Sequence, residues 1–436
     1  MEKTGDFVKV TTADDVSEGV LMPSQKEYLV VIKLDSGYNK AIRKDHVKNV
    51  EVLESYKPLA EKPVEEVPRS GLPTIAILHT GGTIASKVDY RTGGVTARFT
   101  PAELLEMFPE LRDVANIRSR LISNMWSEDM RFAHYNLMAQ AIKEQVQQGC
   151  KGVIITHGTD TLHYSAAALS FMFESLPIPV ILVGSQRSSD RGSSDAAMNV
   201  ICAARFITQT NFSDVAICMH AASDDLACVI LPGTKTRKMH ATRRDAFEPI
   251  NALPWAHVSF EDRTITWLRN DWKQGALNDT KADIVYKPFK EDLRIAIIKT
   301  HPNMNASQFS AYKGYDGVII EGFGLGGHAP INAIDMQTKE HHKIAESIKA
   351  LIKGGTLVAA ATQTVYGRVN MNVYSTGRDM KSMGVIGDGH DMTSETAFIK
   401  LAWLLSNYPK KDVPDLFIDN LHGEISSRSL YEEHDG

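Results

Sequence analysis

The stretch Leu78-His79-Thr80-Gly81-Gly82-Thr83-Ile84-Ala85-Ser86 indicates the fold of this 436-residue chain, and Thr156-His157-Gly158-Thr159-Asp160-Thr161 repeats its pattern. Each stretch follows an apolar β-branched run, at 74–78 and 153–155, so each is predicted to be a buried strand that opens into a loop. Open α/β sheets bind ligands in loops at the carboxyl ends of parallel strands. Because both loops carry threonine hydroxyls and one carries a carboxylate, they indicate a hydrolytic site built from threonine.

Strands and helices alternate from residue 74 onward. Helices are predicted at 131–148, 166–173 and 195–207, and strands at 180–183 and 215–219. This alternation predicts a mostly parallel sheet covered by helices, and therefore an α/β fold. A second α/β unit is predicted from near Leu293, with strands at 295–298, 317–321 and 356–361 and helices at 337–353 and 394–405. The stretch 258–292 lacks clear periodicity and is expected to connect the two units.

The first 55 residues contain short predicted strands instead, at 7–11, 18–22, 28–34 and 39–42, with turn residues between them. They predict a small all-β, SH3-like barrel that serves either as a docking module or as a stabilising appendage. Residues 57–73 carry four prolines with interleaved charge, the composition of an exposed linker. The expected domains are the barrel module at 1–56, the linker at 57–73, an N-terminal catalytic domain at 74–275, a C-terminal domain at 293–410 and a tail at 411–436.

Composition excludes several classes of function. A net charge of −5 and a pI of about 6.3 argue against a chain that holds nucleic acid mainly by its own charge. No apolar run is long enough to span a bilayer and no basic leader precedes one, so a cytoplasmic location without membrane contact is expected. The four cysteines are expected to be buried free thiols, and no metal site is expected, His341-His342 included.

The run Gly322-Phe323-Gly324-Leu325-Gly326-Gly327 matches the G-x-G-x-x-G pattern of dinucleotide-binding loops. In that motif the third glycine opens a helix, whereas His328-Ala329-Pro330 follows here, and the next predicted strand lacks the acidic residue that holds a ribose. The run is therefore predicted to be a tight turn with close backbone packing, not a cofactor site.

The threonines of the two loops have two possible roles. Taken singly, Thr83 and Thr159 could merely cap the helices that follow them. Taken together with Asp160 and the paired glycines, they could act on a ligand, because glycine lets backbone N–H groups approach it. A hydroxyl becomes a useful nucleophile only when a base accepts its proton and donors stabilise the oxyanion.

Both motifs resemble the two signatures of the bacterial-type L-asparaginases, amidohydrolases that release ammonia from a side-chain amide. Ser127-Glu128-Asp129-Met130 is similar to that family's substrate-clasping turn, and 236–247 is similar to its catalytic-lysine segment. The resemblance covers about residues 73–405. From position alone, Lys238 would be read as a surface lysine beside Arg237.

The resemblance implies roles for particular residues. Thr83 would attack the amide carbonyl, with Tyr90 close to it on a mobile loop. Thr159, Asp160 and Lys238 would form a second group, in which Lys238 eases deprotonation of Thr159. Ser127 and Glu128 would hold the α-carboxylate and α-amino ends of the substrate, although the better-known secreted asparaginases carry Gln at the position of Glu128. Which threonine attacks first is left open.

The leading barrel joined by a proline-rich linker to an asparaginase-like body resembles the D-type subunits of archaeal glutamyl-tRNA(Gln) amidotransferases. That resemblance implies a glutaminase that hydrolyses glutamine or asparagine and passes ammonia to an amidotransferase partner of the E type. ATP and Mg²⁺ would bind the partner, since this chain has no G-x-x-x-x-G-K loop and is expected to hold no cofactor. tRNA(Gln) would be bound mainly by the partner. A homodimer within a heterotetramer is expected, with Glu395 near the site of a second copy.

Two other functions remain open from the sequence. One is a free-standing cytoplasmic L-asparaginase in which the first module only stabilises the fold. The other is a non-catalytic amino-acid sensor whose threonine loops hold an amino acid.

Overall fold

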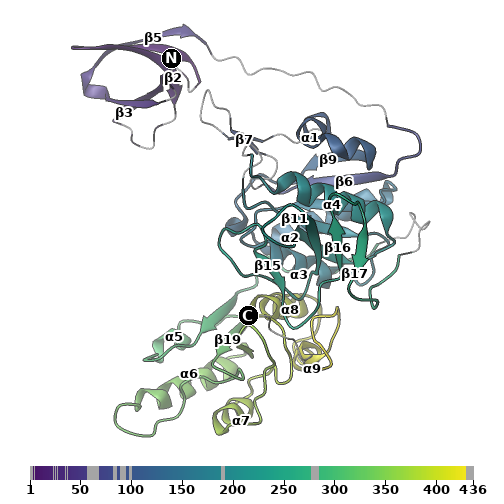
Figure 1. Ribbon diagram of the computed structural model, residues 1–436. Helices are drawn as coiled ribbons and strands as arrows, with labels where there is room; N and C mark the ends of the chain where they lie inside the picture. The colour runs from purple at the N-terminus through teal and green to yellow at the C-terminus, as the bar shows by residue number, and fades with distance from the viewer. Residues whose placement is uncertain are drawn as a thin grey trace.

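The computed structural model describes three units along the chain (Figure 1). The described residues are 3, 5–22, 24, 26, 28–34, 36, 38–55, 68–81, 86–88, 95–97, 101–187, 192–275 and 284–428, with the backbone alone at 86–88, 95–97 and 101–102. Residues 56–67, the greater part of the expected linker, lie outside them.

The N-terminal unit is a five-stranded antiparallel sheet in the order β4-β3-β2-β1-β5. Its elements are β1 Phe7–Thr12, β2 Val16–Met22, β3 Leu29–Lys33, β4 Asn39–Arg43, the short 3₁₀ helix Lys44–His46 and β5 Val47–Glu54. Val8, Val10, Ile32 and Ile42 form its small core. The sequence predicts the first four strands, whereas β5, in which three charged residues stand among the others without regular alternation, was not predicted.

The second unit is built on an eight-stranded sheet in the order β17-β16-β13-β12-β11-β10-β6-β9. Its strands are β6 Thr74–His79, β9 Asn116–Leu121, β10 Gly152–Thr156, β11 Val180–Val183, β12 Val215–His220, β13 Ala227–Pro232, β16 Ala256–Ser259 and β17 Ile265–Trp267. The strands from β9 to β12 pair in parallel, and those from β12 to β17 pair antiparallel. The sheet is therefore mixed, with its parallel part where the sequence predicts it.

The stretch 258–292 is not only a connection, as the sequence suggested, because β16 ends and β17 lies within it and both extend the large sheet. These strands are three or four residues long, and charged residues separate them. β17 lies at the edge of the sheet, where one neighbour is missing and apolar content can be low, and β16 lies next to it. For that reason the continuous apolar run that marks a buried strand does not reveal them.

Helices cover both faces of the large sheet. They are α1 Pro101–Met107, α2 Phe132–Gln147, α3 Leu162–Met172 and α4 Ala196–Gln209, with short 3₁₀ turns at Pro109–Asp113 and Ser127–Asp129. Alternate residues of β6 show the division: Ala76 and Leu78 pack with α2 and α3, whereas Ile75 and Ile77 pack with α1 and α4. Two small hairpins, β7 Ser86–Val88 with β8 Val95–Ala97 and β14 Thr236–Lys238 with β15 Phe247–Pro249, lie outside the sheet.

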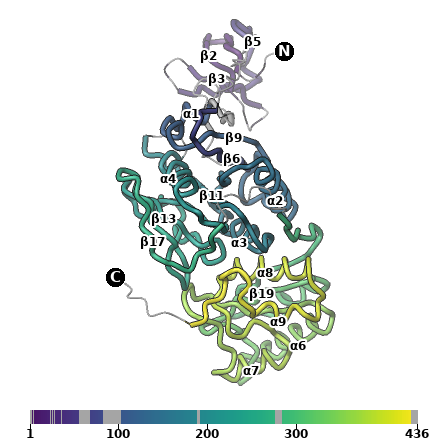
Figure 2. The backbone as a smooth tube through the Cα atoms, turned by 90° about the vertical axis from the view of Figure 1, so that its right-hand side faces the viewer, coloured from purple at the N-terminus to yellow at the C-terminus, as the bar shows by residue number. Residues whose placement is uncertain are grey.

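The C-terminal unit is a parallel three-stranded sheet in the order β18-β19-β20. Its elements are β18 Ile295–Lys299, α5 Ser307–Ser310, β19 Gly317–Gly322, α6 Glu340–Lys353, β20 Leu357–Thr362, α7 Ser375–Ser382, α8 Ser394–Asn407 and α9 Val413–Ile418. Helix α8 packs against β19 on one side and against α3 of the second unit on the other, and it lies at the junction of the two units in Figures 1 and 2. The two units therefore share one core.

The run 322–327 forms a tight loop after β19, as predicted from the residues that follow it. A Cβ atom on Gly322 would lie 2.8 Å from the backbone nitrogen of His328, and Gly324, Gly326 and Gly327 all have positive φ. Close backbone packing thus explains Gly322, and positive φ explains the other three glycines.

The segment after residue 410 begins with α9 and is anchored by a buried charge. Lys400 of α8 and Glu424 form an ion pair with 2.6 Å between Nζ and Oε1, and both side chains are fully buried. All four cysteines are buried free thiols, as expected. Of the helices in the described ranges, none combines the length and apolar character needed to cross a membrane.

Candidate active site

Three neighbouring parallel strands end at one edge of the large sheet. Thr156 at the end of β10 lies beside His79 at the end of β6, which in turn pairs with Leu121 at the end of β9. The loops that follow these strands must therefore meet. The two loops predicted to form the site are among them.

The loop after β6 is tied to its neighbours by its first residues. Thr80 donates hydrogen bonds from its backbone nitrogen (3.1 Å) and its Oγ1 (3.0 Å) to the carbonyl oxygen of Thr156. Gly81 follows with φ of 114°, and a Cβ atom there would lie 2.3 Å from the carbonyl oxygen of Met125. Only glycine fits this approach. Thr83 and Tyr90, the expected nucleophile and its neighbour, lie outside the described residues.

The loop after β10 places Thr159 and Asp160 beside Lys238 of β14. Lys238 Nζ donates to Thr159 Oγ1 at 2.8 Å and to Asp160 Oδ1 at 2.7 Å. The lysine side chain is 11% exposed and that of Asp160 is 66% exposed, so the ammonium is sheltered while its counter-charge faces the solvent. A lysine in hydrogen-bonding contact with a hydroxyl is the arrangement that activates a threonine. The structure thus brings together three of the predicted catalytic residues, although Lys238 comes 79 positions after Thr159 and 78 after Asp160 in the chain.

The predicted substrate-clasping turn packs against the same loop. Ser127 is buried, and its carbonyl oxygen accepts a 2.6 Å hydrogen bond from Thr161 Oγ1. A Cβ atom on Gly158 would lie 2.8 Å from Cβ of Ser127, so the two backbones are in close contact. Glu128, the next residue of the turn, is exposed. Ser127 therefore contacts the residues on either side of Thr159 and Asp160, and the substrate-binding role of Ser127 and Glu128 stays a prediction.

Two buried histidines hold the strand ends and stay neutral. Burial lowers the pKa of His79 to about 3, and its ring nitrogens contact Thr156 Oγ1 (2.8 Å) and Ser119 Oγ (3.1 Å). Burial lowers the pKa of His157 to about 4, and its Nε2 lies 2.8 Å from Ser165 Oγ. Groups that bind protons only near these pH values are poor proton carriers at neutral pH. Both histidines therefore organise the loops.

A third loop, after β11, was not identified from the sequence. Thr159 Oγ1 lies 3.5 Å from Gln186 Oε1. A Cβ atom on Gly184 would lie only 2.8 Å from the methyl carbon of Thr159, so this loop packs closely against Thr159. The signal was present in the sequence, because 180–183 is an apolar run that ends in Gly184-Ser185-Gln186, the same strand-to-loop pattern as the first two loops.

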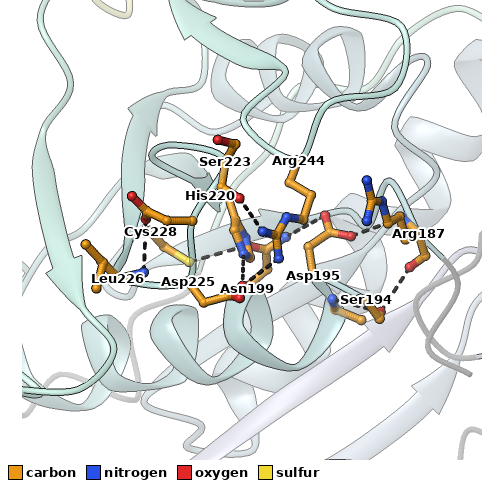
Figure 3. A network of polar contacts seen from close by, with 12 residues as sticks. Arg187, Ser194, Asp195, Asn199, His220, Ser223, Asp225, Leu226, Cys228 and Arg244 are labelled. Carbon is orange, nitrogen blue, oxygen red and sulfur yellow. Dashed lines mark hydrogen bonds and ion pairs between the residues drawn. The ribbon is translucent and has the colours of Figure 1, made fainter. Parts of the chain in front are cut away.

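The buried carboxylate of Asp195 fixes this third loop (Figure 3). It accepts hydrogen bonds from the backbone nitrogens of Gln186 and Arg187, each at 3.0 Å, and from Ser185 Oγ at 2.9 Å. Asn199 Nδ2, one turn along α4, lies 3.3 Å from the same carboxylate. A charge that is fully removed from water is stabilised by such donors.

The polar contacts continue from Asn199 to the loop that follows Lys238 (Figure 3). His220 Nδ1 lies 2.6 Å from Asn199 Oδ1, and His220 Nε2 lies 3.2 Å from Asp225 Oδ1. Asp225 also pairs with Arg244 at 2.6 Å, and Arg244 donates to the carbonyl oxygen of Ser223. The network joins the loop that contacts Thr159 to the hairpin that carries Lys238. In the part of the chain that the structure describes, no group of three His, Cys, Asp or Glu side chains is arranged to hold a metal ion.

Families of known proteins match all three units. The asparaginase N-terminal domain matches residues 74–273, the glutaminase/asparaginase C-terminal domain matches 294–417 and the GatD N-terminal domain matches 2–53. Proteins named as the D-type subunit of glutamyl-tRNA(Gln) amidotransferase align over almost the full length. The one from Methanococcus maripaludis is 43% identical over 428 residues, which are 97% of this chain and 98% of that protein. The one from Pyrococcus furiosus is 41% identical over 436 residues, 97% and 95% of the two chains.

Solved structures of asparaginases match a smaller part. The thermostable L-asparaginase from Thermococcus kodakarensis is similar with a TM-score of 0.70 and 27% identity, over 81% of this chain and 100% of that one. L-asparaginase I from Vibrio cholerae gives a TM-score of 0.69 and 28% identity, over 81% and 99%. The asparaginase fold predicted from the two threonine loops is confirmed. The amidotransferase relatives cover more of the chain than the asparaginases do.

Proposed function

Because this chain belongs to the family of D-type glutamyl-tRNA(Gln) amidotransferase subunits, whose body is an asparaginase, we propose that it is the glutaminase of a tRNA-dependent amidotransferase. It hydrolyses the side-chain amide of glutamine, or of asparagine, and releases ammonia. A partner subunit uses that ammonia to convert glutamyl-tRNA(Gln) to glutaminyl-tRNA(Gln). The observation that carries the chemistry is Lys238 Nζ within 2.8 Å of Thr159 Oγ1 and 2.7 Å of Asp160 Oδ1.

The reaction would proceed in two steps. The hydroxyl oxygen of Thr83 attacks the carboxamide carbon, and its proton passes by way of Thr159 and Lys238 to the leaving nitrogen, so ammonia departs and an acyl ester remains. Water then cleaves the ester, which yields the free amino-acid carboxylate and restores the hydroxyl. Lys238 donates to Thr159 and so favours loss of the Thr159 proton. Asp160 holds the ammonium of Lys238 in place.

The substrate's α-end would bind on the other side of this group. Ser127 and Glu128 bind the α-carboxylate and α-amino groups of the substrate. The exposed carboxylate of Asp160 adds a contact for the substrate's α-ammonium group. Tyr90 is assigned a place beside Thr83 by the resemblance to the asparaginases alone. Holding a substrate at several points turns the attack into an effectively intramolecular step, which is a large part of the rate enhancement available to such enzymes.

The remaining chemistry is assigned to the partner subunit. Activation of the glutamyl group by ATP with Mg²⁺ takes place there, since this chain has no loop of the form G-x-x-x-x-G-K. The net charge of −5 suits a chain that meets tRNA(Gln) mainly through its partner. A homodimer of this chain within a heterotetramer in the cytoplasm completes the proposal. Light scattering of the purified complex measures that stoichiometry.

A free-standing L-asparaginase is the second candidate, and the similarity to the asparaginases of Thermococcus kodakarensis and Vibrio cholerae favours it. Those structures match 81% of the chain, whereas the GatD N-terminal domain matches residues 2–53. The leading module therefore supports the amidotransferase. A pure amino-acid sensor has less support, since binding alone does not require a lysine directed at a threonine.

One assay separates the three candidates. Ammonia release is measured from glutamine and from asparagine, with and without the partner subunit and glutamyl-tRNA(Gln), for the wild type and for Thr83→Ala. The amidotransferase glutaminase releases ammonia when partner and tRNA are present, and Thr83→Ala lowers this release at least about 10²-fold. Rapid asparagine hydrolysis by the chain alone, unchanged by partner and tRNA, would identify the asparaginase. Release equal in wild type and variant would identify the sensor.

A further inference from the structure

The residues next to Lys238 point in two directions. In an extended strand successive side chains lie on opposite faces, so Arg237 lies on one face of β14 and Lys238 on the other, while Lys235 lies in the turn just before the strand. The hairpin keeps this segment extended, because Arg237 pairs with Glu248 and Lys238 with Phe247 in β15. Lys238 thus faces Thr159 while two other cations face away from it.

Both of those cations pair with the C-terminal domain. Lys235 Nζ lies 2.8 Å from Asp391 Oδ1, and both side chains are at most 2% exposed. Arg237 Nη2 lies 3.0 Å from Glu395 Oε1, with side chains 28% and 12% exposed. Asp391 lies three residues before the first residue of α8, and Glu395 is the second residue of that helix. The start of one helix therefore receives two ion pairs from the segment that carries the lysine.

The start of α8 is itself fixed. Thr393 caps the helix by accepting a 3.2 Å hydrogen bond from the backbone nitrogen of Thr396. Ser394 Oγ donates to Glu321 Oε1 at 3.0 Å, and Thr396 Oγ1 donates to the carbonyl oxygen of Thr234 at 3.0 Å. The carboxylate of Glu395 is thus presented from a rigid support.

Arg237 also lies near enough to the site to disturb it. The pKa of His163 is lowered to about 3, first by burial and then by the charges of Arg237 and Lys238, so both cations act on the same region. Asp160 is the carboxylate that binds Lys238. Without Glu395, the hairpin that carries Lys238 would lose one of its two ion pairs with the C-terminal domain.

We propose that Arg237 and Glu395 are positioning residues, through which the C-terminal domain holds Lys238 against Thr159 and Asp160. The inference rests on the proposed function, because it assigns Lys238 a part in amide hydrolysis. Neither residue needs to touch the substrate. A lysine side chain has many rotamers, and a misplacement of about 1 Å at a reacting group can lower the rate by about 10²-fold. Loss of the pair should therefore lower kcat and leave substrate binding nearly intact.

The test measures kcat and KM for ammonia release by the full chain with its partner subunit and glutamyl-tRNA(Gln). Glu395→Gln is expected to lower kcat about 10-fold while KM stays within about twofold. Arg237→Glu should do the same, and the double variant Arg237→Glu with Glu395→Arg should regain most of the lost kcat, because the attraction is restored. Recovery by a swap of charges would show that the attraction between the two side chains, and not either side chain alone, sets kcat.

The matched control is Glu174→Gln, which makes the same chemical change in the ion pair of Glu174 with Lys287, 2.5 Å apart. Its kcat should equal that of the wild type. If kcat of Glu395→Gln lies within about twofold of this control, the inference is overturned. If the wild type itself releases no ammonia from either amide, the proposed function fails instead. Arg237→Lys, which keeps the charge, serves where another variant does not fold.

Discussion

Lys238 Nζ lies 2.8 Å from Thr159 Oγ1 although the two residues come from different loops, 79 positions apart. The end of β10 positions Thr159 and the β14 hairpin positions Lys238, so the contact does not depend on a single loop.

The first prediction concerns the amine of Lys238. Lys238→Met keeps the length and the apolar stem of the side chain but removes the donor to Thr159 and Asp160. Ammonia release should fall at least about 10²-fold, the scale for loss of a catalytic group. Lys343→Met is the control, because Lys343 is an exposed lysine of α6. Equal rates in the two variants would remove Lys238 from the mechanism.

The second prediction compares two threonines of one loop. Thr159→Val removes the hydroxyl that contacts Lys238, so kcat should fall and KM should change little. Thr161→Val removes the 2.6 Å hydrogen bond to the carbonyl oxygen of Ser127, which supports the substrate-clasping turn, so KM should rise more than kcat falls. Steady-state kinetics on glutamine measure both. A higher KM in Thr159→Val together with a lower kcat in Thr161→Val would contradict the site described above.

The third prediction concerns Gly81. Gly81→Ala would place a Cβ atom 2.3 Å from the carbonyl oxygen of Met125 at φ of 114°, so the loop after β6 must shift. We expect loss of most activity and a destabilisation of about 1–3 kcal/mol. Gly71→Ala is the matched control, since φ is 89° there but nothing lies within 4 Å of the added atom. Gly71→Ala adds backbone strain without a clash, so its kcat should equal that of the wild type. Full activity of Gly81→Ala would show that the loop tolerates the displacement.

How far the sequence predicts this structure depends on how far apart in the chain the contacting residues are. The runs 74–78 and 153–155 predict buried parallel strands because such strands are apolar throughout, and the loops that follow them are correctly placed. Lys238 could not be chosen from its neighbours, since Arg237, Arg243 and Arg244 offer equal charge, and only the resemblance selects it. The ion pair of Lys235 with Asp391 joins distant positions, and no local pattern marks it.

The fourth prediction concerns acid. Burial lowers the pKa of His390 to about 4. The neutral ring is held at both nitrogens, because Nδ1 accepts from the backbone nitrogen of Met392 at 3.1 Å and Nε2 donates to the carbonyl oxygen of Ala360 at 2.8 Å. The unfolded chain binds this proton near pH 6.5, so stability is fully present above about pH 6.5 and falls as the pH drops from there towards 4. His390 alone contributes about 1.4 kcal/mol per pH unit in that window.

Urea denaturation at fixed temperature between about pH 4.5 and 7.5 tests this. His390→Gln keeps a donor and an acceptor but does not titrate, so its free energy of unfolding should depend less steeply on pH than that of the wild type. His342→Gln alters an exposed histidine of α6 and should retain the wild-type slope. Identical slopes for His390→Gln and the wild type would refute the assignment.

The fifth prediction concerns the buried pair of Lys400 and Glu424. Glu424 also accepts hydrogen bonds from the backbone nitrogens of Leu421 (3.0 Å) and His422 (2.6 Å). Lys400→Met leaves a buried carboxylate without its cation, which costs about 3–5 kcal/mol. The double variant Lys400→Met with Glu424→Gln should cost less, because no buried charge is left. Chemical denaturation compares the three proteins, and a double variant less stable than Lys400→Met would argue against the pair.

The four buried thiols have a practical consequence. All four cysteines are shielded from solvent, namely Cys150, Cys202, Cys218 and Cys228, so the native protein should not react with maleimide reagents. A single cysteine introduced at an exposed position of the leading module, such as Tyr38, would then carry a fluorescent label alone. The arrival of tRNA or of a partner protein at that module could be followed in real time on an otherwise unaltered background.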